Sequence, residues 1–86
     1  MKPKKITLYP HEYIIAAVPE YASGPGWANQ PLWVHIARND GTMRSECLQP
    51  DEQTSEQHTL FRVGAAVHRQ LVESVAVQRK KEPRDG

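Results

Sequence analysis

Four histidines and one cysteine are the side chains of this chain that could bind a metal ion or take part in catalysis. Imidazole and thiolate groups are common zinc ligands, and structural zinc sites usually draw two ligands from positions only a few residues apart. No CxxC or HxxxH pair occurs, and His58 and His68 are ten residues apart, about 1000° of helical turn, which puts them on well-separated faces. We therefore predict neither a metal site nor any other cofactor.

Cys47 and His35 are the pair that could supply a nucleophile and its base. The register expected for the hairpin below places their side chains on opposite faces of the sheet, and a cysteine is more often a small buried hydrophobe. The stretch Gly24-Pro25-Gly26 does not resemble a phosphate-binding loop, because proline lacks the backbone N–H that such a loop needs. We predict that the protein is not an enzyme.

Length and composition indicate one small globular domain. The chain has 86 residues, of which 38% are hydrophobic and 24% charged, and a net charge of +1. That charge gives no overall field to attract nucleic acid. A single cysteine cannot form an internal disulfide, and the longest apolar run, Tyr13 to Val18, is too short to cross a bilayer. These features predict a cytoplasmic protein without a membrane segment.

Two strands are expected near the N-terminus of an ordered body that covers about residues 6–78 of the single domain 1–86. Residues 6–9 alternate weakly and end at Pro10, while residues 13–18 are rich in β-branched and aromatic side chains and stop at Pro19. A helix beginning at Pro10 is the alternative for the second segment, because proline suits a first helical position. The tip before residue 6 and the tail 79–86 are expected to fray.

Residues 32–48 carry the clearest hairpin signal. Two alternating runs flank Asp40-Gly41, a pair typical of tight reverse turns. With a two-residue loop, Val34 would lie opposite Cys47 and His35 opposite Glu46. One face would then hold Val34, Ile36, Met43 and Cys47, and the other Trp33, His35, Arg44 and Glu46.

A long C-terminal helix is predicted from about Thr54. Thr54 and Gln57 match a capping box, and apolar residues then recur at helical spacing for 22–24 residues. Gly64 within the apolar stripe suggests a close approach to the sheet, with chance tolerance of a glycine as the equal alternative. The expected fold is α+β, a three- to four-stranded antiparallel sheet packed against one long helix.

The loop at residues 20–31 is the best candidate for a recognition surface. Its aromatic residues Tyr21 and Trp27 belong to the types that dominate binding hot spots, and its prolines stiffen it. The alternative is that Trp27 folds back and caps the core. Together with the exposed sheet face, the predicted partner-binding residues are Tyr21, Trp27, Asn29, Trp33, His35, Arg44 and Glu46.

Two other kinds of partner are considered beside a protein partner. The basic run Arg79-Lys80-Lys81 could contact nucleic acid, although the aromatic residues that usually accompany such a surface lie elsewhere in the sequence. A homodimer could also stabilise a core of this size through a sheet edge or a helix face.

The segments from Glu12 to Val34 and from Glu46 to Gln53 resemble small accessory proteins of temperate bacteriophages. Such proteins typically bind and disable a component of the host, for example a CRISPR complex or another defence or surface machine. The resemblance implies an inhibitor or modulator of a host protein complex, acting in the host cytoplasm.

Overall fold

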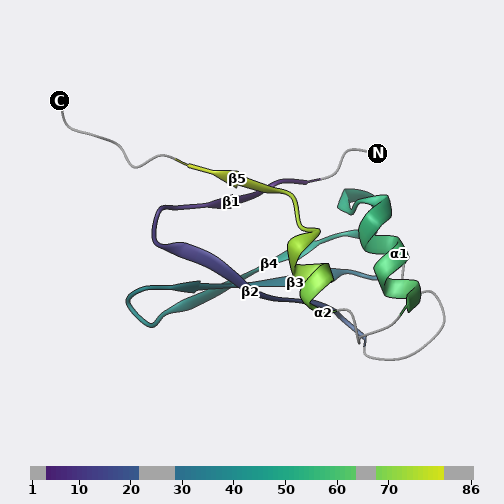
Figure 1. Ribbon diagram of the computed structural model, residues 1–86, viewed down its shortest axis with the longest axis horizontal. Coiled ribbons are helices and arrows are strands. Elements are labelled where there is room, and N and C mark those ends of the chain that lie inside the picture. The colour runs from purple at the N-terminus through teal and green to yellow at the C-terminus, as the bar shows by residue number, and fades with distance from the viewer. Residues whose placement is uncertain (1–3, 22–28, 64–67, 81–86) are drawn as a thin grey trace.

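A three-stranded antiparallel sheet and a separate pair of parallel strands form the framework of the protein. The computed structural model describes residues 4–21, 29–63 and 68–80 (Figure 1). The large sheet has the order β2-β3-β4, and β1 pairs with β5. In chain order the elements are β1 (Ile6–Leu8), β2 (Glu12–Pro19), β3 (Leu32–Arg38), β4 (Met43–Leu48), a 3-10 turn (Pro50–Glu52), α1 (Ser55–Val63), α2 (His68–Glu73) and β5 (Val77–Arg79).

The predicted strand at residues 13–18 is confirmed, and the alternative of a helix from Pro10 is wrong. This segment forms β2, which pairs antiparallel with β3 from Glu12 opposite Arg38 to Pro19 opposite Leu32. The register shifts between Ile14 and Ala16, which leaves a bulge in the strand. Extended backbone is what its β-branched and aromatic side chains favour.

The hairpin between β3 and β4 is present, but its loop has three residues rather than the expected two. Arg38 N donates to Thr42 O at 3.0 Å, and Gly41 N donates to Arg38 O at 3.1 Å. Gly41 has φ +89°, the left-handed conformation that ends a turn of this kind. The carboxylate of Asp40 accepts from both the N and Oγ1 of Thr42, at 2.9 and 2.6 Å, and so fixes the longer loop.

This one-residue difference moves every side chain of β4 to the other face of the sheet. Val34 lies opposite Glu46, and Ile36 opposite Arg44, so these charged residues share the inner face with the core. Cys47 lies opposite Trp33 on the outer face. The predicted composition of the two faces is therefore wrong for β4, and so is the placement of Cys47 and His35 on opposite faces.

The long C-terminal helix is also not what the chain forms. Two short helices, α1 and α2, are followed by β5, which pairs with β1 in parallel. The side chain of Ser74 donates to Leu71 O at 2.7 Å, just where α2 ends. Beyond it Val77 pairs with Ile6 in a strand, the conformation that a β-branched residue favours. Gly64, for which close packing on the sheet was expected, lies outside the described residues.

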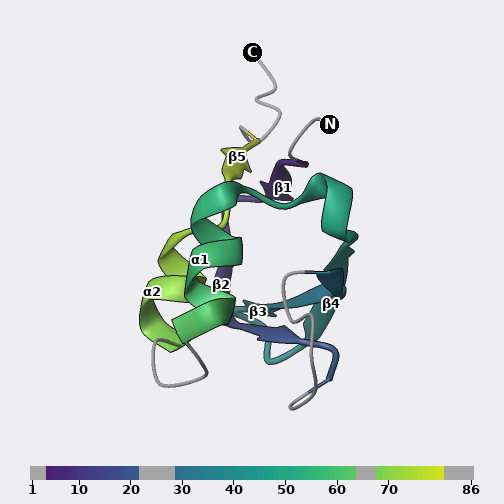
Figure 2. The ribbon, with the colours of Figure 1, turned by 90° about the vertical axis from the view of Figure 1, so that its right-hand side faces the viewer.

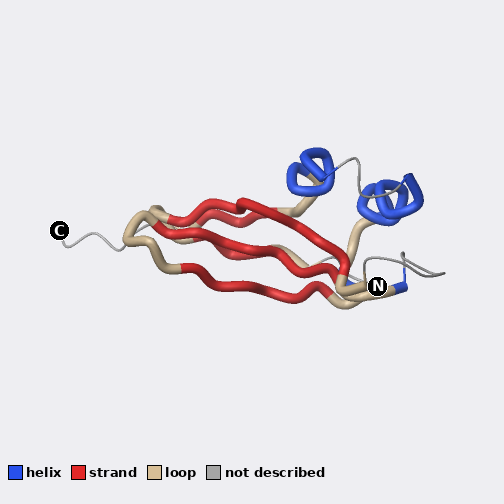
Figure 3. The backbone as a smooth tube through the Cα atoms, turned by 90° about the horizontal axis from the view of Figure 1, so that it is seen from below, coloured by secondary structure: helices blue, strands red, loops and turns tan. Residues whose placement is uncertain are grey.

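The core lies between the inner face of the large sheet, the two helices and β1. Figure 2 shows α1, α2 and the β1–β5 pair on one side of β2, β3 and β4, and Figure 3 shows both helices beside the strands, towards the end that lies away from the C-terminus. Thr54 and Gln57 form the predicted capping box at the start of α1, since each backbone N–H donates to the other's side chain, at 2.9 and 3.2 Å. The buried apolar cluster comprises Ile6, Leu8, Ala17, Leu32, Val34, Ile36, Leu48, Phe61, Leu71 and Val75.

Candidate protein-binding site

Two buried glutamines hold the base of the loop that follows β2. The Oε1 of Gln30 accepts a hydrogen bond of 2.5 Å from Tyr21 N, and Glu20 N donates to Pro31 O at 2.9 Å. Gln53 then donates from its Nε2 to Gln30 O at 2.8 Å and to Leu48 O at 3.1 Å. The start and the end of the loop are thereby fixed to each other and to the end of β4.

Tyr21 and Asn29 stand exposed on either side of this closed base. Tyr21 is 60% exposed although its own backbone N–H is bonded to a buried side chain, and Asn29 is the residue just before Gln30. We call this pair of exposed residues, with the clamp beneath them, the loop-base platform. Trp27, the third predicted residue of the loop, lies outside the described residues.

The other four predicted binding residues do not form one surface. Trp33 and His35 lie on the outer face, where Trp33 Nε1 donates to Glu20 Oε1 at 3.4 Å and His35 Nδ1 is 2.8 Å from Ser45 Oγ. Arg44 and Glu46 lie on the inner face and contact each other, Arg44 Nη1 with Glu46 Oε2. A sheet separates the two pairs, because the true register differs by one residue from the expected one.

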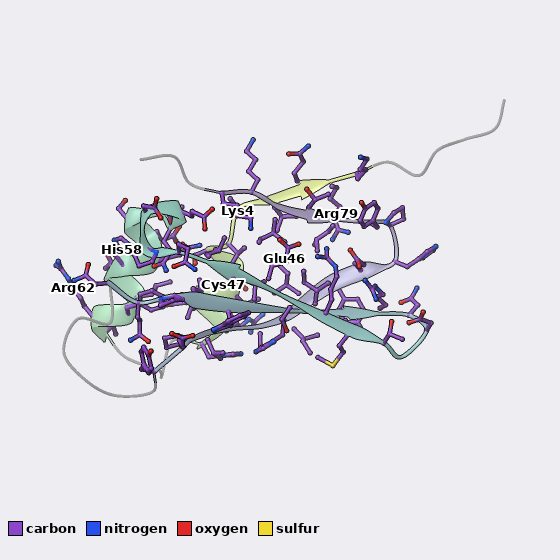
Figure 4. The ribbon with its side chains drawn as sticks, turned by 180° about the vertical axis from the view of Figure 1, so that it is seen from behind. Lys4, Glu46, Cys47, His58, Arg62 and Arg79 are labelled. Atoms are coloured by element: carbon purple, nitrogen blue, oxygen red, sulfur yellow. The ribbon has the colours of Figure 1, made fainter. Side chains whose placement is uncertain are left out.

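Arg44 instead belongs to a network centred on Glu12, which the sequence interpretation missed. Glu12 is only 4% exposed at its side chain, and its carboxylate accepts from Arg38 Nε at 2.8 Å and from Arg44 Nε at 2.9 Å. Arg44 Nη2 also reaches Thr7 O at 2.7 Å. At the edge of the network Lys4 Nζ lies 3.7 Å from Glu46 Oε1 (Figure 4).

The network joins the two sheets rather than presenting a charge to a ligand. Hydrogen bonds from Arg44, from Tyr9 N and from Arg38 lower the pKa of Glu12 to about 2, against the opposing effect of burial. The same contacts raise the pKa of Arg44, chiefly through its bond to Glu12. Arg79 Nη1 donates to the backbone O of Glu12 at 3.3 Å, so this residue of the basic run, the alternative contact for nucleic acid, contacts the network.

Cys47 is poorly suited to nucleophilic chemistry. Burial, followed by the negative charges of Glu20 and Glu52, raises the pKa of the Cys47 thiol, which keeps it protonated and uncharged at neutral pH. Among the described residues, its polar contact is a 3.6 Å approach from Gln49 Nε2. Within residues 4–21, 29–63 and 68–80, no group of three histidine, cysteine or acidic side chains is arranged to hold a metal ion.

A shallow hollow of about 610 Å³ lies between the tips of the β1–β2 and β3–β4 loops. Its polar side chains already bond to one another: His11 Nδ1 lies 3.3 Å from Asn39 Nδ2, and Arg38 bonds to Glu12. This hollow therefore holds no cluster of unsatisfied groups aimed at one point. It is lined by Tyr9, Pro10, His11, Glu12, Arg38, Asn39 and Asp40.

Comparison of the chain with protein-family models, with curated proteins and with solved structures found no match. No helix in the described part of the chain is long and apolar enough to cross a membrane.

Proposed function

We propose that this chain is a non-enzymatic protein-binding module, encoded by a bacteriophage, that binds a host protein complex and modulates its activity. The contact is made by the loop-base platform, with Tyr21 as its anchor. The observation that carries the proposal is the clamp of Gln30 and Gln53, which fixes the backbone beneath Tyr21 from within the core.

The clamp supports a binding role because burying amide side chains is costly unless they make hydrogen bonds. Here Gln30 Oε1 and Gln53 Nε2 make the bonds that hold the ends of a surface loop, while Gln53 Oε1 is buried without a partner among the described residues. A loop base that is already ordered loses less conformational entropy when a partner binds, so more of the contact energy remains as affinity. Tyrosine on such a support adds a large contact area with few rotatable bonds.

A photo-crosslinking experiment tests the proposal. A benzophenone amino acid is placed at Tyr21 and, as the control, at Thr59, an exposed position on α1. After irradiation in a bacterial lysate, the Tyr21 probe is expected to capture a defined protein that the Thr59 probe does not. Excess unlabelled wild-type protein should abolish that capture. Equal capture by both probes, or none at Tyr21, would contradict the proposal.

The role of the clamp is then measured with the captured protein in purified form. Tyr21→Ala should weaken binding by at least about tenfold, as expected of a hot-spot residue. Gln30→Ala should weaken binding too, although it leaves the Tyr21 side chain intact, because it removes the acceptor for Tyr21 N. The matched control is Gln70→Ala, at an exposed glutamine of α2. If the folded Gln30→Ala variant binds with unchanged affinity, the clamp does not contribute to binding.

A further inference from the structure

The outer face of the three-stranded sheet is a second surface, distinct from the loop-base platform. Residues paired across the strands share a face, and their register arranges nine outward side chains in three rows of three. His35 is at the centre, on the middle strand and in the middle row. The rows are Tyr13, Ala37 and Met43; Ala16, His35 and Ser45; and Val18, Trp33 and Cys47.

None of these nine side chains is an aspartate, glutamate, lysine or arginine, whereas 24% of the chain is charged. The strand charges of Glu12, Arg44 and Glu46 lie on the inner face instead. The helices and the β1–β5 pair also stand on the inner side, so no described element covers the outer face (Figure 2). Depletion of charge is typical of the central part of a protein interface.

The first row is complementary in shape to the third row of a second copy. Tyr13 and Met43 are 49% and 57% exposed, and between them Ala37 is only 9% exposed. The long side chains of Tyr13 and Met43 therefore project on either side of the short side chain of Ala37, which leaves a depression on the central strand. Sheets pack face to face when large side chains of one enter low positions of the other.

We propose that this outer face is the interface of a homodimer, in which a second copy of the chain packs the same face against it. A twofold interface brings each central residue against its own copy, and the absence of charged side chains from the nine positions avoids the like-charge repulsion that this would otherwise cause. The carboxylate of Glu20 approaches the face only at its end row, through Trp33 Nε1. With His35 on the twofold axis and the strands of the two copies antiparallel, the first row of one copy lies against the third row of the other. The partner's Trp33 then lies over Ala37, and the partner's His35 lies next to His35.

The face is small for a stable dimer, and this sets the concentration range of the test. Three strands of about seven residues cover roughly 23 by 14 Å. Standard interfaces bury about 800 Å² on each partner, which is well above the area of this face. We therefore expect a dissociation constant in the micromolar range.

The dimer is tested by introducing charged residues of either sign at its centre. Sedimentation of the wild-type protein from about 1 to 300 µM should show a monomer–dimer equilibrium. His35→Glu and His35→Lys should each weaken self-association by at least about tenfold, because each brings like charges together. An equimolar mixture of the two should again sediment as a dimer. The neutral His35→Gln variant should behave as wild type.

A second pair of variants decides the question if the His35 variants do not fold. Met43→Asp changes an exposed residue of the face and should abolish the dimer, while Val63→Asp changes an equally exposed apolar residue on α1 and should not. A wild-type protein that stays monomeric over the whole range, or a mixture that does not reassociate, would overturn the proposal. Crosslinking at Tyr21 is a separate readout, so failure of the dimer leaves the proposed function standing.

Discussion

The carboxylate of Glu12 on β2 and the guanidinium of Arg44 on β4 face each other through two parallel hydrogen bonds. Arg44 Nε donates to Oε2 and Nη2 to Oε1, both at 2.9 Å. The strand β3 separates these residues in the sheet, yet both reach the same point because both are on the inner face. From there Arg44 also contacts Thr7 O, which ties β1 to the large sheet.

Glu12→Gln is expected to destabilise the fold by on the order of 3 kcal/mol, because it leaves two arginines without their buried counter-charge. Urea unfolding followed by circular dichroism measures the free energy. The matched control is Glu73→Gln, which removes the exposed pair with Arg69 and should cost less than about 1 kcal/mol. Similar losses in both variants would contradict a special role for Glu12.

The same carboxylate predicts how stability depends on pH. The pKa of Glu12 is about 2 in the folded protein and 4.5 ordinarily, so the unfolded state binds the proton more readily. Its contribution is complete above pH 4.5 and is lost as the pH falls from there towards 2. A difference of this size amounts to on the order of 3 kcal/mol. Urea titrations should show this loss in the wild type, and Glu12→Gln should have a flatter profile.

Gly41→Ala should destabilise the β3–β4 hairpin by on the order of 1 kcal/mol, because alanine is strained at φ +89°. Nothing lies within 4 Å of the added Cβ, so the cost is one of backbone conformation and not of a clash. Gly41→Asn should recover part of the loss, since asparagine tolerates this region better. The thermal midpoint gives the measurement, and equal midpoints for the Ala and Asn variants would contradict this reasoning.

Thr54→Ala should cost about 1 kcal/mol, because it removes the side-chain acceptor for Gln57 N at the start of α1. Thr54→Ser keeps the hydroxyl and should remain close to wild type. Urea unfolding of both variants provides the comparison. A serine variant as unstable as the alanine variant would show that the methyl group, and not the cap, is responsible.

Local patterns predicted the strands and the capping box well, because neighbouring residues determine them. The turn was harder, since Asp40-Gly41 suits both a two- and a three-residue loop. The bonds from Thr42 to Asp40 decide between them, and with the choice the face of every β4 residue changes. The expected placement of Arg44 and Glu46 on the same face as Trp33 and His35 was wrong for this single reason.

The helix prediction failed because apolar residues continue to recur at helical spacing past Glu73, where α2 ends, and into β5. Val75 is buried in the core, while Val77 belongs to β5 and finds its pairing partner in Ile6. Local propensity cannot reveal that distant partner. The Glu12 network was missed for the same reason, although one signal was available: antiparallel pairing of the strand at 13–18 with that at 32–38 brings Glu12 opposite Arg38.

The parallel pairing of β1 with β5 has a consequence for the order of folding. Ile6 is synthesised well before its ladder partner, Val77, which follows only after both helices. Until then β1 has no strand beside it, and the hairpin of β3 and β4, whose contacts are local, can form much earlier. The pairing of β1 can therefore form only after β5 has been synthesised, and a nascent chain arrested before β5 would expose the apolar residues of β1.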